Sequence, residues 1–370
     1  MLPPTDPLSS AAGSAGGSSA PGSAPGDAGA DSQRPARARP AARVVALTGA
    51  ASFLGRNLVG VLEGDPRTAK IIAIDQKAPE TSGKKTRMYP VDLTAPASGE
   101  RVAEILSAEK VDTLLHLAFL SSPTHASAWA HELESVGTMH MLNAARQVSL
   151  RKLILWSQTI LYGAHPTNPN FLTERHPLRA EAEEPFFGDK MAAEREVAAF
   201  AAKAKGTVVT TLRTAPIVGP TVNNYITRYL AQRVVMTLLG FDPLWQFVHE
   251  VDAIAAFKLA IDRDFPGVFN IVGEGVLPLA TVIKIAGRTA APVPHPLANL
   301  MIAASWAAQT AYAPPSFLRY LRYLCVADGD KAARVMGFRP AYSSREALLD
   351  YVSAQRLRDV HLLHEAKGAL

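Results

Sequence analysis

The segment from Val44 to Gly55, VVALTGAASFLG, constrains the fold of this chain most strongly. Its first half is a run of apolar, partly β-branched residues, which is typical of a strand buried on both faces. The run breaks at Gly49 into a loop of small residues, and Leu54, Leu58 and Leu62 then recur at helical spacing. The segment therefore predicts a strand, a tight glycine turn and a helix, whose first N–H groups are suited to a pyrophosphate.

The glycine positions of a dinucleotide-binding turn are here Gly49, Ser52 and Gly55, so serine takes the place of a glycine. A second apolar run, Ile71–Ile74, ends at Asp75, at a distance typical of dinucleotide-binding folds. A carboxylate there accepts hydrogen bonds from the ribose hydroxyls of NAD and repels the 2′-phosphate of NADP, so we expect NAD rather than NADP. The alternative is a glycine-softened turn with an ordinary aspartate at the end of a strand.

The chain of 370 residues, 48% of them hydrophobic, is long enough to bury a large core. Residues 1–42 are different, because they are mainly Ala, Gly, Ser and Pro and carry too few apolar side chains to offset the entropy of ordering them. We expect a disordered tail there, without a secretory signal, although its arginines leave a targeting or anion-binding role open.

The net charge of +5 is small for this length, and both signs are interspersed, so binding of nucleic acid is not expected. Cys325 is the single cysteine, which excludes an internal disulfide and favours a cytoplasmic location.

Beyond Asp75, apolar strand patterns alternate with amphipathic helix patterns up to residue 212. This alternation predicts an α/β fold with a doubly wound, parallel, Rossmann-like sheet and a ligand crevice at the carboxyl ends of its strands. We divide the chain into the tail (1–42), a Rossmann-like NAD-binding lobe (43–215), a smaller C-terminal substrate lobe (216–350) that returns a strand and a helix to the first, and a terminal helix (351–370).

Residues 43–350 carry a series of motifs in a characteristic order. The series comprises Thr48–Gly55, Asp75, Asp92-Leu93, His116-Leu117-Ala118, Val136–Thr138, Ser157–Gly163, Thr173-Glu174, Leu212-Arg213, Gly219-Pro220, Phe247–Asp252, Phe269–Gly273 and Gly337–Pro340. The chain thereby resembles extended short-chain dehydrogenases/reductases of the NAD-dependent epimerase/dehydratase family, particularly proteins similar to UDP-galactose 4-epimerase. The resemblance implies an oxidoreductase or isomerase that binds NAD and a nucleotide-sugar-like substrate. It also assigns further cofactor contacts to Phe53, Leu54, Asp92, Leu93, Leu117, Ala118, Lys190 and Pro216.

Catalysis in this family rests on a Ser or Thr, a Tyr as acid/base, and a Lys one helical turn after the Tyr. In this chain the position four residues before Lys190 is Phe186, which has no proton to exchange. Gln158 occupies the place of the usual serine and is flanked by Ser157 and Thr159, so we assign the catalytic positions to Lys190 and to these three residues. Pro216 stands where many members carry a substrate-facing Asn.

Each of these assignments has a structural alternative. Lys190 is otherwise a solvated lysine at a helix start, and Ser157 and Gln158 are otherwise polar residues satisfied by backbone at a strand end. The pair of His249 and Asp252 has a spacing that permits a metal or acid/base site. We expect His249 instead to anchor a strand to the next helix, and we expect no metal.

The segment after Pro216 is aromatic and basic. The resemblance places it on the substrate side, where Arg228 or Arg233 would bind a diphosphate and Tyr225 or Trp245 would stack on a base. Alternatively, Tyr225, Tyr229 and Arg233 form one face of a helix. Residues 297–312 are apolar but too few to span a bilayer, so we expect a buried or partner-facing helix there and no transmembrane segment.

Two functions remain open at this stage. One is an NAD-dependent epimerase/dehydratase-type enzyme with a nonstandard proton relay. The other is a catalytically impaired dinucleotide-binding protein that acts as a sensor or scaffold, which the phenylalanine at position 186 favours. In the family the two helices at about 130–148 and 191–203 pair with their symmetry mates, so we expect a homodimer formed by a second apolar face that includes Met139, Met141, Ala192, Val197 and Ala201.

Overall fold

The computed structural model describes residues 42–368, with the environment of side chains described for residues 42–358. Nearly all of the tail predicted for residues 1–42 therefore lies outside the described residues.

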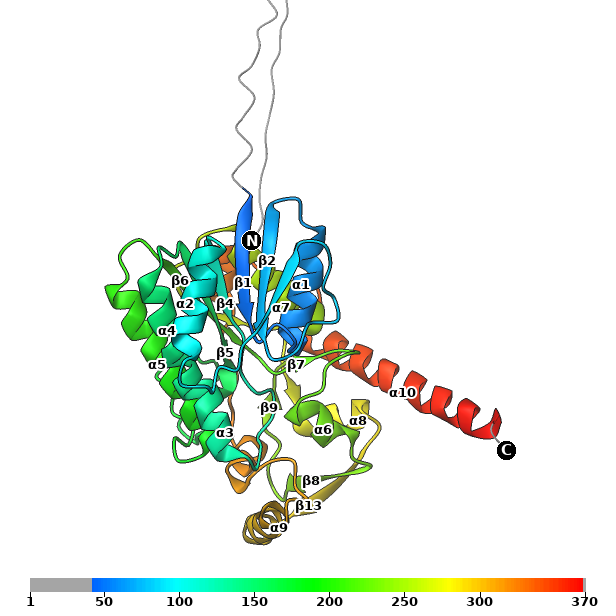
Figure 1. The fold of residues 1–370 in the computed structure, drawn as a ribbon. Helices are drawn as coiled ribbons and strands as arrows, with labels where there is room; N and C mark the ends of the chain where they lie inside the picture. Colours follow the sequence, from blue (N-terminus) through cyan, green and yellow to red (C-terminus); the bar gives the residue numbers. More distant parts are fainter. Residues whose placement is uncertain (1–41, 369–370) are drawn as a thin grey trace, which may run out of the picture. The chain divides into compact units, whose positions relative to one another are not determined.

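A seven-stranded parallel sheet forms the centre of the described chain (Figure 1). Its strands are β1 (Arg43–Thr48), β2 (Thr68–Asp75), β3 (Thr86–Pro90), β4 (Thr113–His116), β5 (Lys152–Gln158), β6 (Val208–Thr214) and β11 (Gly267–Ile271). The order across the sheet is β11-β6-β5-β4-β1-β2-β3, so the direction of winding reverses between β1 and β4. This order confirms the predicted doubly wound α/β fold, and it places the ligand crevice beside β1 and β4.

Helices cover both faces of the sheet, so the residues of its central strands β4 and β5 are all buried. One layer contains α1 (Phe53–Gly64) and α7 (Glu250–Asp262), which contact each other. The other layer contains α2 (Ser98–Ala108), α4 (Gly137–Gln147) and α5 (Pro185–Lys203). Ahead of α4, the short helix α3 (Ser127–His131) continues through a π-helical turn, Glu132–Val136.

The later part of the chain builds three small two-stranded sheets. Their strands are β7 (Ile217–Val218) with β10 (Val248–His249), β9 (Leu244–Trp245) with β12 (Leu277–Pro278), and β8 (Val234–Leu238) with β13 (Thr289–Val293). The accompanying helical segments are α6 (Tyr225–Ala231), α8 (Leu279–Ile285), α9 (His295–Ala307), α10 (Ser344–Gly368), the 3₁₀ turns Thr159–Tyr162 and Pro315–Leu321, and a π-helical turn Ala332–Met336. Part of this region has a small core of its own, centred on Val235, Leu279 and Leu318.

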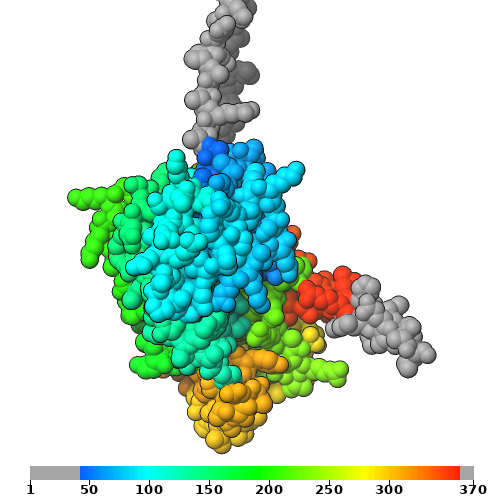
Figure 2. All heavy atoms as spheres, viewed as in Figure 1, coloured from blue at the N-terminus to red at the C-terminus, as the bar shows by residue number. Residues whose placement is uncertain are grey.

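The apolar helix α9 lies at the surface of the protein. Figure 2 shows exposed atoms in the yellow-orange colour of residues near 300. Ala298 is its one fully buried residue, while Leu297, Leu300 and Met301 are exposed. The expectation of a buried helix is therefore wrong, and a partner-facing role stays a prediction. Within the part of the chain that the structure describes, no helix has both the length and the apolar composition that crossing a membrane requires.

The helices predicted to pair in a homodimer are α4 and α5. Met141 and Val197, assigned to their outer faces, are fully buried in the core of the chain itself. Met139 is 44% exposed, and Ala201 is exposed as well, so the outer apolar face is narrower than the sequence indicated. The homodimer stays a prediction, as does the cytoplasmic location.

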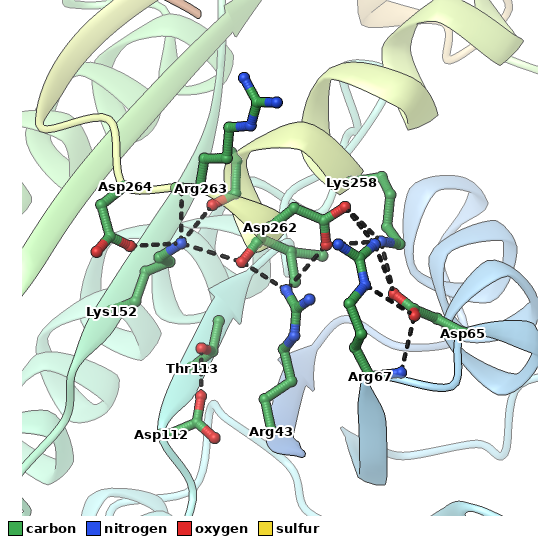
Figure 3. Close-up of polar contacts among 12 residues, drawn as sticks. Arg43, Asp65, Arg67, Asp112, Thr113, Lys152, Lys258, Asp262, Arg263 and Asp264 are labelled. Carbon is green, nitrogen blue, oxygen red and sulfur yellow. Dashed lines mark hydrogen bonds and ion pairs between the residues drawn. The ribbon is translucent and has the colours of Figure 1, made fainter. Parts of the chain in front are cut away.

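An ion network closes the edge of the sheet at which the strands begin (Figure 3). The Lys152 ammonium is fully buried and donates to the carbonyl oxygens of Ala260, Ile261 and Arg263 at 2.7, 3.0 and 2.7 Å, and it lies 2.9 Å from the Asp264 carboxylate. The Lys152 ammonium thereby supplies donors for carbonyl oxygens that have no partner within α7. Its positive charge also interacts favourably with the negative C-terminal end of the helix dipole.

A second part of this network surrounds Asp65, which lies 2.6 Å from the Lys258 ammonium and also binds Arg67 (Figure 3). Burial raises the pKa of the Asp65 carboxyl, but the hydrogen bonds from Lys258 and Arg67 outweigh burial and hold this pKa well below its usual range. These contacts fix the edge opposite the ligand crevice.

Candidate functional site

The glycine turn packs directly on the end of β4. Gly49 has φ +68°, and a Cβ there would lie 2.7 Å from backbone atoms of Leu117 and Ala118. A Cβ on Gly55 would lie 2.2 Å from the Gly49 carbonyl oxygen. Ser52 is the N-cap of α1, and its hydroxyl oxygen accepts a hydrogen bond from the Gly55 N–H at 3.1 Å. The serine thus stabilises the helix start, and both glycines are sterically required.

Asp75 ends β2 beside this turn and is half-buried. One carboxylate oxygen accepts from the Ala51 N–H at 2.9 Å, and the other accepts from the Gln76 N–H at 2.7 Å. Each oxygen keeps a lone pair, so the carboxylate can still accept hydrogen bonds from ribose hydroxyls. The turn and the predicted ribose acid are therefore connected by a hydrogen bond within the protein.

The other predicted cofactor contacts follow β3 and β4. Asp92 is exposed, and its pKa is lowered by hydrogen bonds from the Thr94 hydroxyl and N–H. Leu93, Leu117 and Ala118 are buried.

A cavity of about 220 Å³ opens at the carboxyl ends of β1, β4, β5 and β6. The start of α1, the residues after β4, the ends of β5 and β6, and the start of α6 form its wall. The predicted site residues that it brings together are Ser52, Phe53, Leu54, Gln158, Pro216 and Tyr225. This is the place where the winding of the sheet reverses, and ligands of such sheets bind there.

The wall of this cavity fits the pyrophosphate of a dinucleotide. The first N–H groups of a helix have no acceptors within the helix, and the positive end of its dipole favours an anion. In this chain the twelve-residue helix α1 presents that end, since Ser52, Phe53 and Leu54 line the cavity. The N-terminus of α1 and the Asp75 carboxylate are the groups that would hold such a cofactor.

Lys190 lies in a buried ion pair. Its ammonium is 2.8 Å from both carboxylate oxygens of Glu134 and 3.7 Å from the centre of the Phe186 ring. The side chains of Lys190 and Glu134 are 4% and 1% exposed. Burial lowers the pKa of Lys190 and raises that of Glu134, while the charge of each partner opposes the shift. The alternative of a solvated lysine is therefore wrong.

The hydroxyls nearest the expected catalytic position are already engaged. Ser157 donates to the Glu194 carboxylate, which also pairs with Arg213. Arg213 donates to the Tyr162 hydroxyl at 2.7 Å, and this hydroxyl donates to Asn270 at 2.8 Å. Tyr162 therefore belongs to a buried structural network.

The two neighbours of Ser157 have separate surroundings. Gln158 lines the cavity described above, whereas Thr159 lines a smaller adjacent one. The structure therefore does not gather Lys190, Ser157, Gln158 and Thr159 around one point.

The predicted substrate residues separate in the same way. Tyr225 lines the cavity, whereas Arg228 and Arg233 are not among the described residues that form its wall. Arg228 donates instead to the Asn223 side chain at 3.0 Å, and Arg233 is exposed. Because α6 ends at Ala231, the alternative of one helical face reaching Arg233 is wrong.

His249 and Asp252 bind different partners. His249 is the N-cap of α7, accepts from the Val251 N–H, and lies 3.0 Å from the Asp350 carboxylate. Asp252 accepts from the N–H groups of residues 341 and 342. Among the described residues, no group of three or more His, Cys, Asp or Glu side chains is placed to hold a metal ion.

Sequence reasoning missed Glu134. The signal was present, because Ala130, Glu134, Thr138 and Met141 recur at helical spacing and all are buried. An acid in such a stripe needs a buried cation as its partner.

A protein-family model matches the part of the chain that forms this cavity. The model of the NAD dependent epimerase/dehydratase family matches residues 45–272, which run from within β1 to the end of β11 and include the cavity wall. This match confirms the resemblance seen in the sequence, and the family's NAD dependence confirms the predicted cofactor.

Among curated proteins, the chain is 30% identical over 329 residues to the uncharacterized protein Rv0501 of Mycobacterium tuberculosis, covering 88% of each chain. It is 26% identical to the 3-diazoavenalumate denitrifying reductase of a Streptomyces species, covering 81% of this chain and 97% of that relative.

Solved structures share the fold. MoeE5 in complex with UDP-glucuronic acid and NAD aligns with a TM-score of 0.66 at 23% identity, covering 85% of this chain and 99% of that one. UDP-glucose 4-epimerase of Thermotoga maritima, with UDP-glucose bound, aligns with a TM-score of 0.65 at 19% identity and the same coverage.

Proposed function

The chain belongs to the NAD dependent epimerase/dehydratase family, and we propose that it is an NAD-dependent oxidoreductase that converts a small molecule in the cavity at the carboxyl ends of β4, β5 and β6. One observation carries this proposal: the start of α1, the end of β5 and a buried tyrosine line a single cavity.

Bound NAD supplies the hydride acceptor or donor. The N-terminus of α1 binds the pyrophosphate, and Asp75 binds the adenosine ribose. Gln158 lines the cavity and orients the reacting group of the substrate by hydrogen bonding.

Tyr225 is the group that we assign as the acid/base. It is the phenol in the cavity wall, and its ring centre is 6.0 Å from that of Phe186, in an edge-to-face arrangement. The other buried tyrosines, Tyr162 and Tyr351, donate hydrogen bonds to protein groups, whereas no described residue binds the Tyr225 hydroxyl. Burial raises the pKa of Tyr225, so its hydroxyl is protonated at neutral pH but is a weaker acid than an exposed phenol. Its role as acid/base therefore requires that the bound cofactor or substrate lowers this pKa towards neutrality.

The structural neighbours hold UDP-glucuronic acid and UDP-glucose, which makes nucleotide sugars one class of candidate substrate to test. The relative named as a reductase supports a net oxidation or reduction instead of an epimerisation. Neither the structural neighbours nor the reductase relative identifies the substrate.

A second candidate function is a dinucleotide-binding sensor or scaffold. The pairing of Lys190 with Glu134 favours it, because an ammonium held by a buried carboxylate and a phenyl ring is less available to position a nicotinamide ribose.

The test starts from purified full-length protein, whose NAD content is measured after release by denaturation. Candidate substrates are then added and the absorbance of reduced nicotinamide is followed for wild type, Tyr225→Phe and the control Tyr229→Phe. We expect Tyr225→Phe to retain NAD and to lose about 10²-fold or more in turnover, whereas Tyr229→Phe keeps most of it. Bound NAD that no small molecule reduces or reoxidises would favour the sensor or scaffold.

A further inference from the structure

A second cavity, of about 300 Å³, lies between α6, α9 and the 3₁₀ turn Pro315–Leu321. Its wall is dominated by large apolar and aromatic side chains, which include Tyr229, Met236, Trp245, Ile302, Phe317 and Leu321. No Asp, Glu, Lys or Arg is among the described residues that line it.

Five of the polar side chains of this wall donate to main-chain oxygens. The Tyr229 hydroxyl donates to the Met236 carbonyl at 2.7 Å, and the Trp245 indole N–H donates to the Tyr320 carbonyl at 3.1 Å. The remaining donors with the same kind of partner are the hydroxyls of Tyr320, Ser305 and Thr310. The wall therefore offers a ligand mainly ring faces and methyl groups, with the hydroxyls of Tyr225 and Tyr312 and the Gln232 amide as its uncharged polar groups.

Tyr225 borders this cavity and the one at the sheet, and its ring centre lies 5.2 Å from that of Phe317. A third, smaller cavity shares Tyr225 and Trp245 with the second one. Charged side chains are likewise missing from the described walls of the first and third cavities. The reactive group of a substrate can approach the Tyr225 hydroxyl from the side of α6. The rest of such a substrate then contacts these apolar walls.

We infer that the second cavity binds the non-reacting part of the substrate, and that this part is an uncharged, largely apolar ring system or chain. The inference rests on the proposed function, since it names the substrate class of the same site. A diphosphate is a dianion that proteins bind with cations or with N–H groups of a helix start. Burying it against walls without such groups is strongly unfavourable, so a nucleotide sugar does not fit this cavity.

The test measures binding of the neutral fluorescent probe N-phenyl-1-naphthylamine to the full chain. Ser305 lines the cavity from α9, so Ser305→Trp fills it, and Ser305→Leu is a milder variant should the tryptophan not fold. Leu300→Trp is the matched control, because Leu300 lies on the same helix, is 66% exposed and is outside the wall. NAD binding by each variant is measured separately by calorimetry.

We expect the probe to bind wild type and Leu300→Trp alike, and Ser305→Trp or Ser305→Leu about tenfold or more weakly. Excess UDP-glucose should leave the probe in place. Equal binding by wild type and the filled variants, or displacement by UDP-glucose, would overturn the inference. The two proposals fail separately: NAD binding without probe binding rejects only the apolar site, and probe binding without NAD binding rejects only the oxidoreductase.

Discussion

Removing the carboxylate of Glu134 is the perturbation whose effect the structure specifies best. In Glu134→Ala, the Lys190 side chain, which is 4% exposed in the wild type, loses both 2.8 Å contacts of its ammonium. The N–H of Leu120, which donates to the same carboxylate, loses its acceptor as well. Breaking one side of a buried ion pair typically costs about 3–5 kcal/mol of unfolding free energy, and we expect a loss in that range.

The reverse variant, Lys190→Met, should also be destabilising, because the buried carboxylate loses its cation. Burial raises the pKa of Glu134 and lowers that of Lys190, so in each single variant a change of protonation of the remaining partner limits the loss. The double variant Glu134→Leu with Lys190→Met replaces both charges by apolar groups, and it should lie within about 1–2 kcal/mol of wild type. The two single changes are therefore expected to be strongly non-additive.

Urea unfolding at one pH measures all four proteins, and Glu132→Ala is the matched control because Glu132 is exposed on the same π-helical turn. A loss below about 1 kcal/mol in Glu134→Ala, similar to that of the control, would refute the buried ion pair. Calorimetry with NAD then separates the two roles of Lys190. A cofactor role predicts weaker NAD binding in Lys190→Met and in the double variant, and a purely structural role predicts unchanged binding.

Four further predictions concern single positions. Phe186→Tyr should raise turnover in a substrate assay if a phenol at this position can exchange a proton with the bound substrate, and Phe187→Tyr is the control for position. Equal rates for wild type and both variants would leave Tyr225 as the acid. Asp75→Ala should weaken NAD binding and reduce the preference over NADP, and calorimetry giving wild-type affinities for both cofactors would contradict the assignment. Lys152→Met leaves the three carbonyls at the end of α7 without their donor and should cost about 2–4 kcal/mol in urea unfolding, whereas a loss below about 1 kcal/mol would exclude a capping role. Because the pKa of Asp65 is lower in the folded state, its carboxylate stabilises the fold above the unfolded pKa of about 4, and this stabilisation is lost as the pH falls through the folded-state pKa. The difference in unfolding free energy between wild type and Asp65→Asn should therefore shrink below about pH 4. A difference that stays constant with pH would contradict this prediction.

The sequence alone determined the first lobe. The apolar runs, the turn at Gly49 and the acid at Asp75 are local signals, because strand burial and glycine geometry depend on a few neighbouring residues. They were sufficient for the alternating elements, the doubly wound sheet and the position of the cofactor turn. The motif order added the family and NAD, which the comparison with known proteins confirmed.

The tertiary structure decided the chemistry of the site. Lys190 and Glu134 are 56 residues apart, so no local pattern shows that packing removes both charges from water and pairs them. Ser157 reads as a free hydroxyl until the fold brings Glu194 beside it, 37 residues later. The arginines of the substrate segment fall outside the cavities, while Tyr225 borders three of them. A sequence states which groups are present, but their solvation and their partners arise only when distant elements pack together, and these set which group can move a proton or bind a charge.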